Sequence, residues 1–340
     1  MNFFVSEYLC GGAWPESELP ASLAREGRAM LQAVVSDLAG LNNLPDHSIE
    51  VYTTWDRRAD ACPFENVTHV HVIQVDDPQS EWITAIDLAE RCDRTMVIAP
   101  EFDDILAARV EGLELTTANS ANSTVEAIRL CADKLRVDEW CQARSLPTIP
   151  TVLLSEPIPW EDIVIKRRDG AGSIDMRRVL KSEIDDIADQ NPEQWIAQPY
   201  VSGKTFSVGC FFDCGKVTQR LFCFEQLLSG DGRFEYQGGR TLNDPQLEQL
   251  ARRVIEQIAI PGLHGYVGFD FIQPTNDPDQ ILLVEINPRL TTSYVGYRVA
   301  WDDLRFPAVG LLGAHAQFPQ RDRDVQFTCD GNVHELLTEC

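Results

Sequence analysis

Apolar runs and helical spacings alternate along the first third of the chain. Short apolar runs predict strands, whereas apolar residues that recur at three- and four-residue intervals predict helices. Because the two patterns alternate over short connections, they predict a parallel sheet in an α/β domain. The predicted elements, in chain order, are strand Phe3–Val5, helix 23–38, strand Val70–Val75, helix Glu81–Cys92 and strand Thr95–Ala99.

A second pattern begins near Asn119 and contains longer strands. Ser123 and Glu126 have the spacing of a capping box, which predicts the start of a helix that leads towards Lys134. Near the end of the pattern, a loop rich in Pro, Asn and Asp separates two apolar runs and predicts a hairpin. The further predicted elements are the strands Ile163–Lys166, Trp195–Val201 and Thr205–Asp213, a helix over 245–258, and the hairpin strands Tyr266–Gln273 and Gln280–Ile286.

Composition narrows the range of partners. The 340 residues include 29 Lys and Arg against 53 Asp and Glu, which gives a formal net charge of −24. This balance argues against a general nucleic-acid or anionic-membrane surface, because both need a positive field. No apolar run approaches the about 20 residues of a membrane span, and the N-terminus lacks the basic start of a signal peptide. With ten scattered cysteines and no C-x-x-C pair, we expect a cytoplasmic protein with reduced thiols.

The last predicted hairpin gathers polar residues on one face. Asp270 faces away from its apolar neighbours, and Glu285 and Asn287 share a face of the partner strand, with Arg289 just beyond. Two carboxylates and an amide oxygen suit a hard cation such as Mg²⁺, which typically bridges protein carboxylates to nucleotide phosphates. The alternative is an ordinary hairpin whose acids face solvent. The apolar run before Glu285 argues against this alternative, because it predicts a buried strand, and charged side chains without partners are unfavourable in free energy there.

Only five lysines occur in the chain, and one of them ends a predicted buried strand. Lys166 is followed by a loop of small residues that includes Gly170, Gly172 and Ser173. Backbone N–H groups of such loops approach phosphate oxygens closely, although a glycine loop beside a lysine is more often a surface hairpin. The chain contains neither a Walker A loop nor a G-x-G-x-x-G fingerprint, so this loop alone does not identify a nucleotide site.

One motif resembles the metal-binding signature of the ATP-grasp superfamily. It follows Asp270 in the chain and reads Val284-Glu285-Ile286-Asn287-Pro288-Arg289. The preceding order is similar too, with Lys134 on a helix, Lys166 at a strand end, the glycine loop, and a hinge at Gln198–Val201. The resemblance covers roughly residues 119–316. It implies an α/β chain with the α+β ATP-grasp fold, in which a small parallel α/β domain precedes a two-lobed ATP-grasp unit. The implied parts are an N-terminal domain (1–118), a small lobe with its glycine lid (119–200), a C-terminal lobe with the metal hairpin (201–320) and a polar tail (321–340).

The resemblance assigns the residues of a nucleotide site. It implies ATP and Mg²⁺ as cofactors, usually two metal ions, with Mn²⁺ as a substitute. Lys134 and Lys166 would bind the phosphates, and the loop with Gly170, Gly172 and Ser173 would form a lid over them. Gln198, Tyr200 and Val201 would surround the adenine, and Asp270, Glu285 and Asn287 would bind the metal. Arg289 would be the catalytic residue that steadies the carboxylate and the acyl phosphate. One position departs from the family, because Thr205 stands where a ribose-binding glutamate is common.

Three short stretches resemble, within this superfamily, the tyramine–glutamate ligases of methanofuran biosynthesis. They are Ser6-Glu7-Tyr8 with Gly11-Gly12, Phe234-Glu235-Tyr236 with Gly238-Gly239, and Thr291-Thr292-Ser293-Tyr294. This narrower resemblance implies glutamate and tyramine as the substrates. The implied substrate residues are Glu7, Gly11, Gly12, Arg240, Tyr294 and Arg298. A tight turn explains Gly11 and Gly12 equally well, and surface salt bridges explain the two arginines equally well.

The implied reaction is ATP-dependent amide formation between a carboxylate and an amine through an acyl phosphate, with release of ADP and phosphate. Two alternatives stay open: a carboxylase-type ATP-grasp enzyme that uses bicarbonate, and a nucleotide-binding module without catalysis. The expected partners are small-molecule substrates, with neither nucleic acid nor membrane, and a homodimer is compatible with these expectations. The amine also needs a general base, for which His264 and Glu235 are candidates, although a core or surface role explains each of them better.

Overall fold

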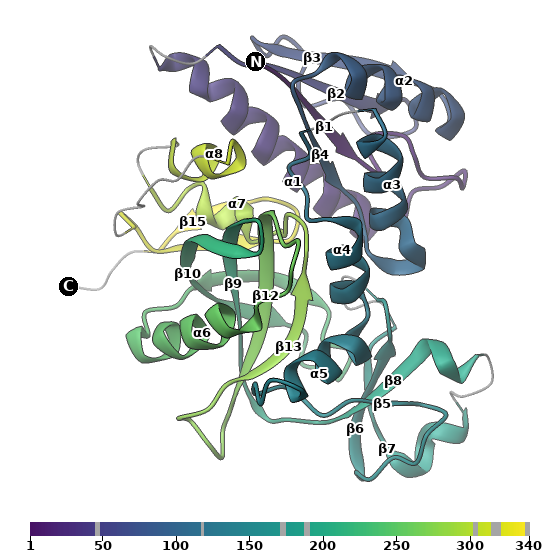
Figure 1. Cartoon of the computed structure of the whole chain (residues 1–340), viewed down its shortest axis with the longest axis vertical. Coiled ribbons are helices and arrows are strands. Elements are labelled where there is room, and N and C mark those ends of the chain that lie inside the picture. Colours follow the sequence, from purple (N-terminus) through teal and green to yellow (C-terminus); the bar gives the residue numbers. More distant parts are fainter. Residues whose placement is uncertain are drawn as a thin grey trace.

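Three β-sheets organise the residues that the computed structural model describes, which are 1–44, 48–116, 119–170, 175–186, 191–301, 305–313 and 321–336. Figure 1 shows the N-terminal sheet with its helices at the top, the seven-stranded sheet below it, and a small four-stranded sheet at the lower right. Within these ranges, no helix combines the length and the apolar character that crossing a bilayer requires.

The N-terminal sheet is parallel, as the alternation of strands and helices predicts. Its strand order is β3 (Val70–Val75), β2 (Glu50–Asp56), β1 (Asn2–Glu7) and β4 (Arg94–Ile98). Helix α1 (Ala21–Gly40) covers the face that contains Phe3 and Val5, whereas α2 (Pro78–Arg91) and α3 (Ile105–Glu114) cover the face of Phe4. Strand β2 is missing from the prediction because its buried residues include two threonines and an aspartate, which give no apolar run.

Two short helices connect the N-terminal domain to the small antiparallel sheet. Helices α4 (Val125–Ala132) and α5 (Lys134–Gln142) meet at Asp133, which is the N-cap of α5. The predicted capping box at Ser123 is wrong, because Thr124 is the N-cap of α4 and the Ser123 hydroxyl bonds the backbone of His264. The antiparallel sheet that follows has the strand order β5 (Val152–Leu153), β8 (Trp195–Pro199), β6 (Asp162–Arg167) and β7 (Arg177–Leu180).

The seven-stranded sheet is antiparallel and separates an apolar face from a polar one. Val267, Phe269 and Phe271 pack in the same core as helix α6 (Pro245–Ile258). Asp270 is on the opposite face, as predicted, and it pairs in register with Glu285. The strand order is β13 (Leu282–Asn287), β12 (Gly265–Pro274), β9 (Gly203–Asp213), β10 (Lys216–Leu228), β11 (Tyr236–Thr241), β14 (Val325–Thr328) and β15 (Val333–Glu335).

Four strands of this sheet are absent from the prediction. Strand β10 has two register irregularities against β9, which disturb the alternation of apolar and polar positions. Strand β11 contains two adjacent glycines, which carry no strand signal. Strands β14 and β15 lie in the segment expected to be a polar tail, but Val325 and Phe327 are fully buried there and extend the sheet. Residues 321–336 therefore belong to the sheet rather than to an appended tail.

The linker between α5 and β5 runs alongside β13. The Leu283 N–H donates to the Pro147 carbonyl at 3.0 Å, and the Ile149 N–H donates to the Leu283 carbonyl at 3.3 Å. The start of the small lobe is therefore bonded to the strand that carries Glu285 and Asn287.

A buried polar cluster fastens α1 to helix α7 (Tyr294–Tyr297), beside helix α8 (Arg305–Leu311). The Asp37 carboxylate accepts hydrogen bonds from the Tyr294 hydroxyl at 3.0 Å and from Arg298 Nε at 2.9 Å. Burial raises the pKa of Asp37, although the Arg298 charge opposes the shift. The N-terminal domain is therefore joined to the large sheet by a charge pair rather than by apolar packing alone.

We expect Arg298→Met to lower the free energy of unfolding by about 3 kcal/mol, because it leaves Asp37 buried without its counter-charge. Chemical denaturation of the purified variant measures this change. The double variant Asp37→Asn with Arg298→Met removes the unpaired charge and should recover most of the loss. A double variant no more stable than Arg298→Met alone would contradict this account of the cluster.

Candidate active site

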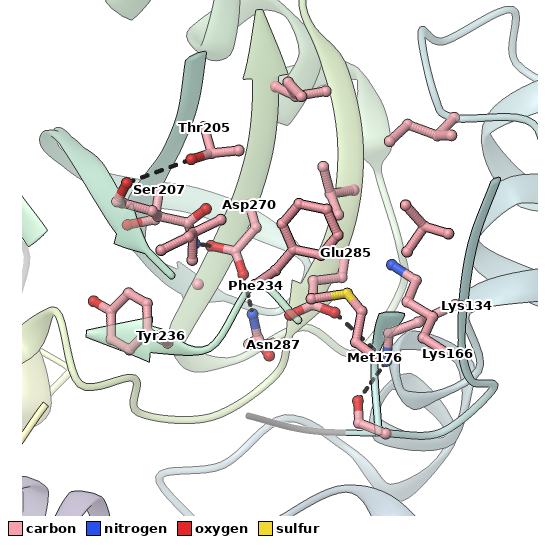
Figure 2. A pocket seen from close by; sticks show the side chains of 18 of the residues that line it. Lys134, Lys166, Met176, Thr205, Ser207, Phe234, Tyr236, Asp270, Glu285 and Asn287 are labelled. Carbon is pink, nitrogen blue, oxygen red and sulfur yellow. Dashed lines mark hydrogen bonds and ion pairs between the residues drawn. The ribbon is translucent and has the colours of Figure 1, made fainter. Parts of the chain in front are cut away.

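One large pocket lies where the small lobe faces the polar side of the seven-stranded sheet. The space within it, together with the open solvent at its mouth, measures about 1370 Å³. The small lobe contributes Lys134, Lys166 and residues 198–200, while β9, β10, β12 and β13 contribute to the opposite wall. Figure 2 shows labelled side chains from both walls around this space.

Asp270 and Glu285 lie side by side on the wall formed by the large sheet (Figure 2). The Asp270 carboxylate accepts hydrogen bonds from Gln226 Nε2 and from Asn287 Nδ2, each at 3.0 Å. Burial and the neighbouring Glu285 charge raise the pKa of Asp270 well above its ordinary value. Two adjacent buried carboxylates of this kind are stabilised by an added cation.

Lys134 and Lys166 face these carboxylates from the small lobe (Figure 2). Lys134 Nζ lies 3.5 Å from Glu285 Oε2. Burial opposes the ionisation of Glu285, but the charges of Lys134 and Lys166 outweigh it and lower the pKa of Glu285 to about 2. Burial lowers the pKa of Lys166 to about 8, although Glu285 attracts its proton. Two buried ammonium groups beside one ionised carboxylate form a site for a polyanion such as a triphosphate.

The chain after Lys166 is fastened to Lys134. The Lys134 N–H donates to the Arg168 carbonyl at 3.1 Å, and its ammonium donates to the Gly170 carbonyl. Gly170 lines the pocket, so the start of the glycine loop lies where the phosphates are expected. Gly172 and Ser173 lie outside the described residues, and the lid stays a prediction.

The hinge residues Gln198, Tyr200 and Val201 line the pocket, with Thr205 nearby. The Tyr200 ring is stacked on Phe234 with ring centres 6.2 Å apart, and the Arg178 guanidinium carbon lies 3.6 Å from the centre of the Tyr200 ring. A wall of stacked aromatic rings suits a planar base such as adenine.

Arg289 lines the pocket and lies just after β13. Its Nε is 2.8 Å from Glu101 Oε1, and only about a tenth of the Arg289 side chain is exposed, 12%. Glu26 of α1 lines the same pocket and accepts a hydrogen bond from the Thr292 hydroxyl at 3.3 Å. The N-terminal domain therefore supplies two carboxylates, Glu26 and Glu101, to the surroundings of Arg289.

The implied substrate residues Arg240, Tyr294 and Arg298 do not line this pocket. Tyr294 and Arg298 are engaged by Asp37, and the Tyr294 ring is fully buried in the core. Arg240 lies outside the pocket, where it pairs with Glu225 at 2.8 Å. The two arginines thus serve in ion pairs of the protein itself.

The N-terminal residues of the narrower resemblance are also outside the large pocket. The Glu7 carboxylate is buried and accepts a hydrogen bond from the Cys10 N–H. At Gly12, φ is +103° and an added Cβ would lie 2.4 Å from Val75, while at Gly11 it would lie 2.0 Å from the Glu7 carbonyl. Both glycines are accounted for by the tight turn after β1. The two base candidates, His264 and Glu235, are likewise absent from the pocket lining.

Three polar residues of the site have no signal in the sequence. Glu26 lies within an amphipathic helix, Gln226 lies in a strand with an irregular register, and Glu101 follows β4 without a motif. Their positions depend on contacts between segments that are far apart in the chain, so only the fold brings them together.

The donor set fits a magnesium ion that shares its ligands with phosphate groups. Asp270, Glu285 and Asn287 offer two carboxylates and an amide oxygen on adjacent strands. In the described part of the chain, no group of three or more His, Cys, Asp and Glu side chains is arranged to hold a metal. A set this small suits Mg²⁺, which keeps positions for water and phosphate oxygens, better than a cation that needs a closed protein cage.

Known protein families match both the segment that forms most of the pocket and the segment before it. Residues 131–293 match the family model of an ATP-grasp domain, and residues 49–128 match that of a pre ATP-grasp domain. The chain thus contains an ATP-grasp domain. The predicted fold, a small parallel domain followed by the ATP-grasp unit, is confirmed.

Individual relatives agree with this assignment. The chain is 24% identical to a tyramine–L-glutamate ligase from Methanocaldococcus fervens over 284 residues, which are 81% of this chain and 84% of that protein. An ATP-grasp superfamily protein from Archaeoglobus fulgidus superposes with a TM-score of 0.70 at 21% identity, over 96% of this chain and 92% of that one. An L-amino acid ligase from Bacillus licheniformis has a TM-score of 0.67 at 13% identity, over 96% and 78% of the two chains. These comparisons support an ATP-dependent enzyme that forms carbon–nitrogen bonds.

The buried ammonium of Lys166 is expected to cost stability in the ligand-free protein. Its pKa of about 8 is below the ordinary 10.5, so the unfolded chain binds the proton more tightly and the cost is fully present below pH 8. We expect Lys166→Met to raise the free energy of unfolding at pH 7 by about 1–3 kcal/mol.

Urea denaturation without nucleotide at several pH values measures this effect. The difference between Lys166→Met and the wild type should shrink as the pH rises from 8 towards 10.5, because the wild-type lysine then becomes neutral in the folded state. Lys216→Met, which changes an exposed lysine, is the matched control and should leave stability unchanged. A Lys166→Met variant less stable than the wild type at pH 7 would disprove the assignment.

Proposed function

We propose that this protein is an ATP-dependent carboxylate–amine ligase that works through an acyl phosphate. The observation that carries the proposal is the pocket in which Lys134 and Lys166 face Asp270 and Glu285, with Arg289 also in its lining. Phosphoryl transfer requires cationic groups for the phosphates and oxygen ligands for a divalent ion, and this pocket offers both on facing walls.

The nucleotide would bind between the two lobes. Lys134 and Lys166 would contact the α- and β-phosphates, and Gln198, Tyr200 and Val201 would surround the adenine. Thr205 offers the ribose a hydroxyl instead of a carboxylate, so we expect the sugar to contribute little to affinity.

Asp270, Glu285 and Asn287 would hold Mg²⁺, which when bound neutralises charge on the terminal phosphates. Gln226 and Asn287 orient the Asp270 carboxylate through its two oxygens. Glu285 has a second task, because it also balances the charges of Lys134 and Lys166 in the ligand-free protein.

The proposed reaction has two steps. The substrate carboxylate attacks the γ-phosphorus of ATP, which gives an acyl phosphate and ADP. The nitrogen of the amine then attacks the acyl carbon, so that a C–N bond forms while the C–O bond to phosphate breaks and phosphate leaves. Arg289, held by Glu101, would orient the carboxylate and stabilise charge on the transferring oxygens.

The substrate pair we propose is glutamate and tyramine. Its support is the relative named tyramine–L-glutamate ligase, which aligns over most of both chains. We expect the purified protein to release ADP from ATP and Mg²⁺ only when both glutamate and tyramine are present, as measured by a coupled ADP assay. ADP release with bicarbonate in place of the two substrates would indicate a carboxylase instead. Binding of ATP without any substrate-dependent turnover would indicate a nucleotide-binding module.

Glu285→Gln should reduce turnover by about 10²–10³-fold, because it removes a metal ligand and a charge that positions both lysines. The control is Glu225→Gln, which removes a carboxylate of the same sheet outside the pocket and should leave turnover unchanged. Circular dichroism verifies that both variants are folded. Near-normal turnover of folded Glu285→Gln would rule out the proposed metal site.

A further inference from the structure

A chain of hydrogen bonds inside the small lobe ends at a residue of the large pocket. Gln198 lines the pocket, and its Nε2 donates to the Thr151 hydroxyl oxygen at 2.8 Å. The Thr151 N–H in turn donates to the Asp138 carboxylate at 2.9 Å. All three residues are buried, with at most 7% of any of them exposed. A buried chain of this kind holds its members in one geometry, because a broken link leaves a polar group unpaired.

The strand register places the Gln198 side chain on the pocket side of its sheet. Gln198 of β8 pairs with Val164 of β6, which also lines the pocket. Their neighbours Ala197 and Ile165 pack in the apolar core of the small lobe instead. Because successive side chains of a strand point to opposite faces, the Gln198 amide lies on the same face as Val164, towards the pocket.

The Thr151 hydroxyl determines which end of the Gln198 amide faces it. A hydroxyl has one proton, and Thr151 donates its proton to the Ile149 carbonyl at 3.0 Å. The hydroxyl oxygen then acts only as an acceptor, so the amide nitrogen of Gln198 must face Thr151. Among the residues that the structure describes, none donates a hydrogen bond to the other end of this amide, the oxygen Oε1. That oxygen is therefore available to a ligand.

Asp138 fixes the backbone at Thr151. Its oxygen Oδ2 accepts the hydrogen bond from the Thr151 N–H and a second one from Gln142 Nε2 at 2.8 Å. Asp138 lies in α5, about one helical turn after Lys134. The helix that supplies Lys134 to the pocket thus also holds the residue that orients Gln198.

The orientation of this amide matters because purine bases differ in their exocyclic group. Adenine has an amino group, which donates hydrogen bonds, whereas guanine and hypoxanthine have a carbonyl oxygen at the same position, which accepts them. An amide that presents its oxygen attracts the amino group and repels the carbonyl. An amide free to turn by half a rotation would offer its nitrogen to the carbonyl bases equally well. Selection between the bases therefore depends on the residues that hold the amide.

We propose that Thr151 and Asp138 are positioning residues, which fix the Gln198 amide with its oxygen towards the nucleobase and thereby make the pocket selective for adenine over bases with an exocyclic carbonyl. Neither Thr151 nor Asp138 lines the pocket, so both act through Gln198. This inference rests on the proposed function, in which Gln198 lies beside the base, and it assigns a task to two residues that belong to no motif.

The test compares the binding of ATP with that of ITP, whose base has a carbonyl in place of the amino group. Isothermal titration calorimetry of the purified protein with Mg²⁺ measures both dissociation constants and requires no turnover. We expect the wild type to bind ATP about 30-fold more tightly than ITP. Thr151→Val removes the hydroxyl with little change of shape, and it should lower this preference about tenfold, because the amide can then present either end to the base.

Matched variants separate the hydroxyl from general effects on the lobe. Thr151→Ser keeps the hydroxyl and should retain the wild-type preference for ATP. Asp138→Asn keeps an acceptor for the Thr151 N–H and should also retain it, whereas Asp138→Leu should lower it. Thr218→Val is the control outside the pocket lining, because the Thr218 hydroxyl likewise donates to a backbone carbonyl, that of Phe211 at 3.1 Å. It should leave both dissociation constants unchanged.

Three results would overturn the positioning role while leaving the ligase in place. The first is a Thr151→Val variant, folded by circular dichroism, that keeps the wild-type preference for ATP. The second is a loss of affinity for ATP and ITP by the same factor, which is the result of a general disturbance of the lobe. The third is equal binding of ATP and ITP by the wild type. If the wild type binds no ATP at all, the proposed function fails and this inference fails with it.

Discussion

Two buried ammonium groups that face two buried carboxyl groups across one pocket form the constraint on which the site depends. Lys134 and Lys166 belong to the small lobe, whereas Asp270 and Glu285 belong to the seven-stranded sheet. Neither wall is stable by itself in an apolar setting, because each would hold like charges without partners. The depressed pKa of Lys166 and the raised pKa of Asp270 show that the compensation is incomplete in the ligand-free protein. The remaining imbalance is what phosphate groups and a divalent cation would remove, so affinity for both follows from the same arrangement.

Helix α1 connects this site to the N-terminal domain through two carboxylates on one face. Glu26 and Asp37 are eleven residues apart, which is close to three helical turns. Asp37 is fixed by Tyr294 and Arg298, and Glu26 accepts a hydrogen bond from Thr292 of the same segment. The same helix therefore contributes one carboxylate to the pocket and one to the cluster at Asp37.

Local chemistry in the sequence was sufficient to predict the parts of the fold whose pattern is regular. The alternation around Asp270 placed it opposite the apolar core, and the aspartate before α6 together with the proline at its first position marked the start of that helix. The irregular strand β10 and the short strands after Val325 were missed because bulges and length remove the period-two signal. Motif residues such as Lys166 and Asn287 could be assigned to the pocket, but Glu26 and Glu101 could not. Their environment is created by tertiary contacts, and an isolated glutamate in a helix or after a strand has many other uses.

The pairing of the α5–β5 linker with β13 has a consequence for contacts between copies of the chain. β13 is the first strand of the seven-stranded sheet, and an uncovered outer strand offers its backbone groups to strands of other molecules. The bonds from Pro147 and Ile149 to Leu283 occupy part of this edge. Another chain would have to displace the linker before it could add a strand there. The linker thereby hinders intermolecular β-pairing, and the aggregation that follows from it, on the strand that contains Glu285 and Asn287.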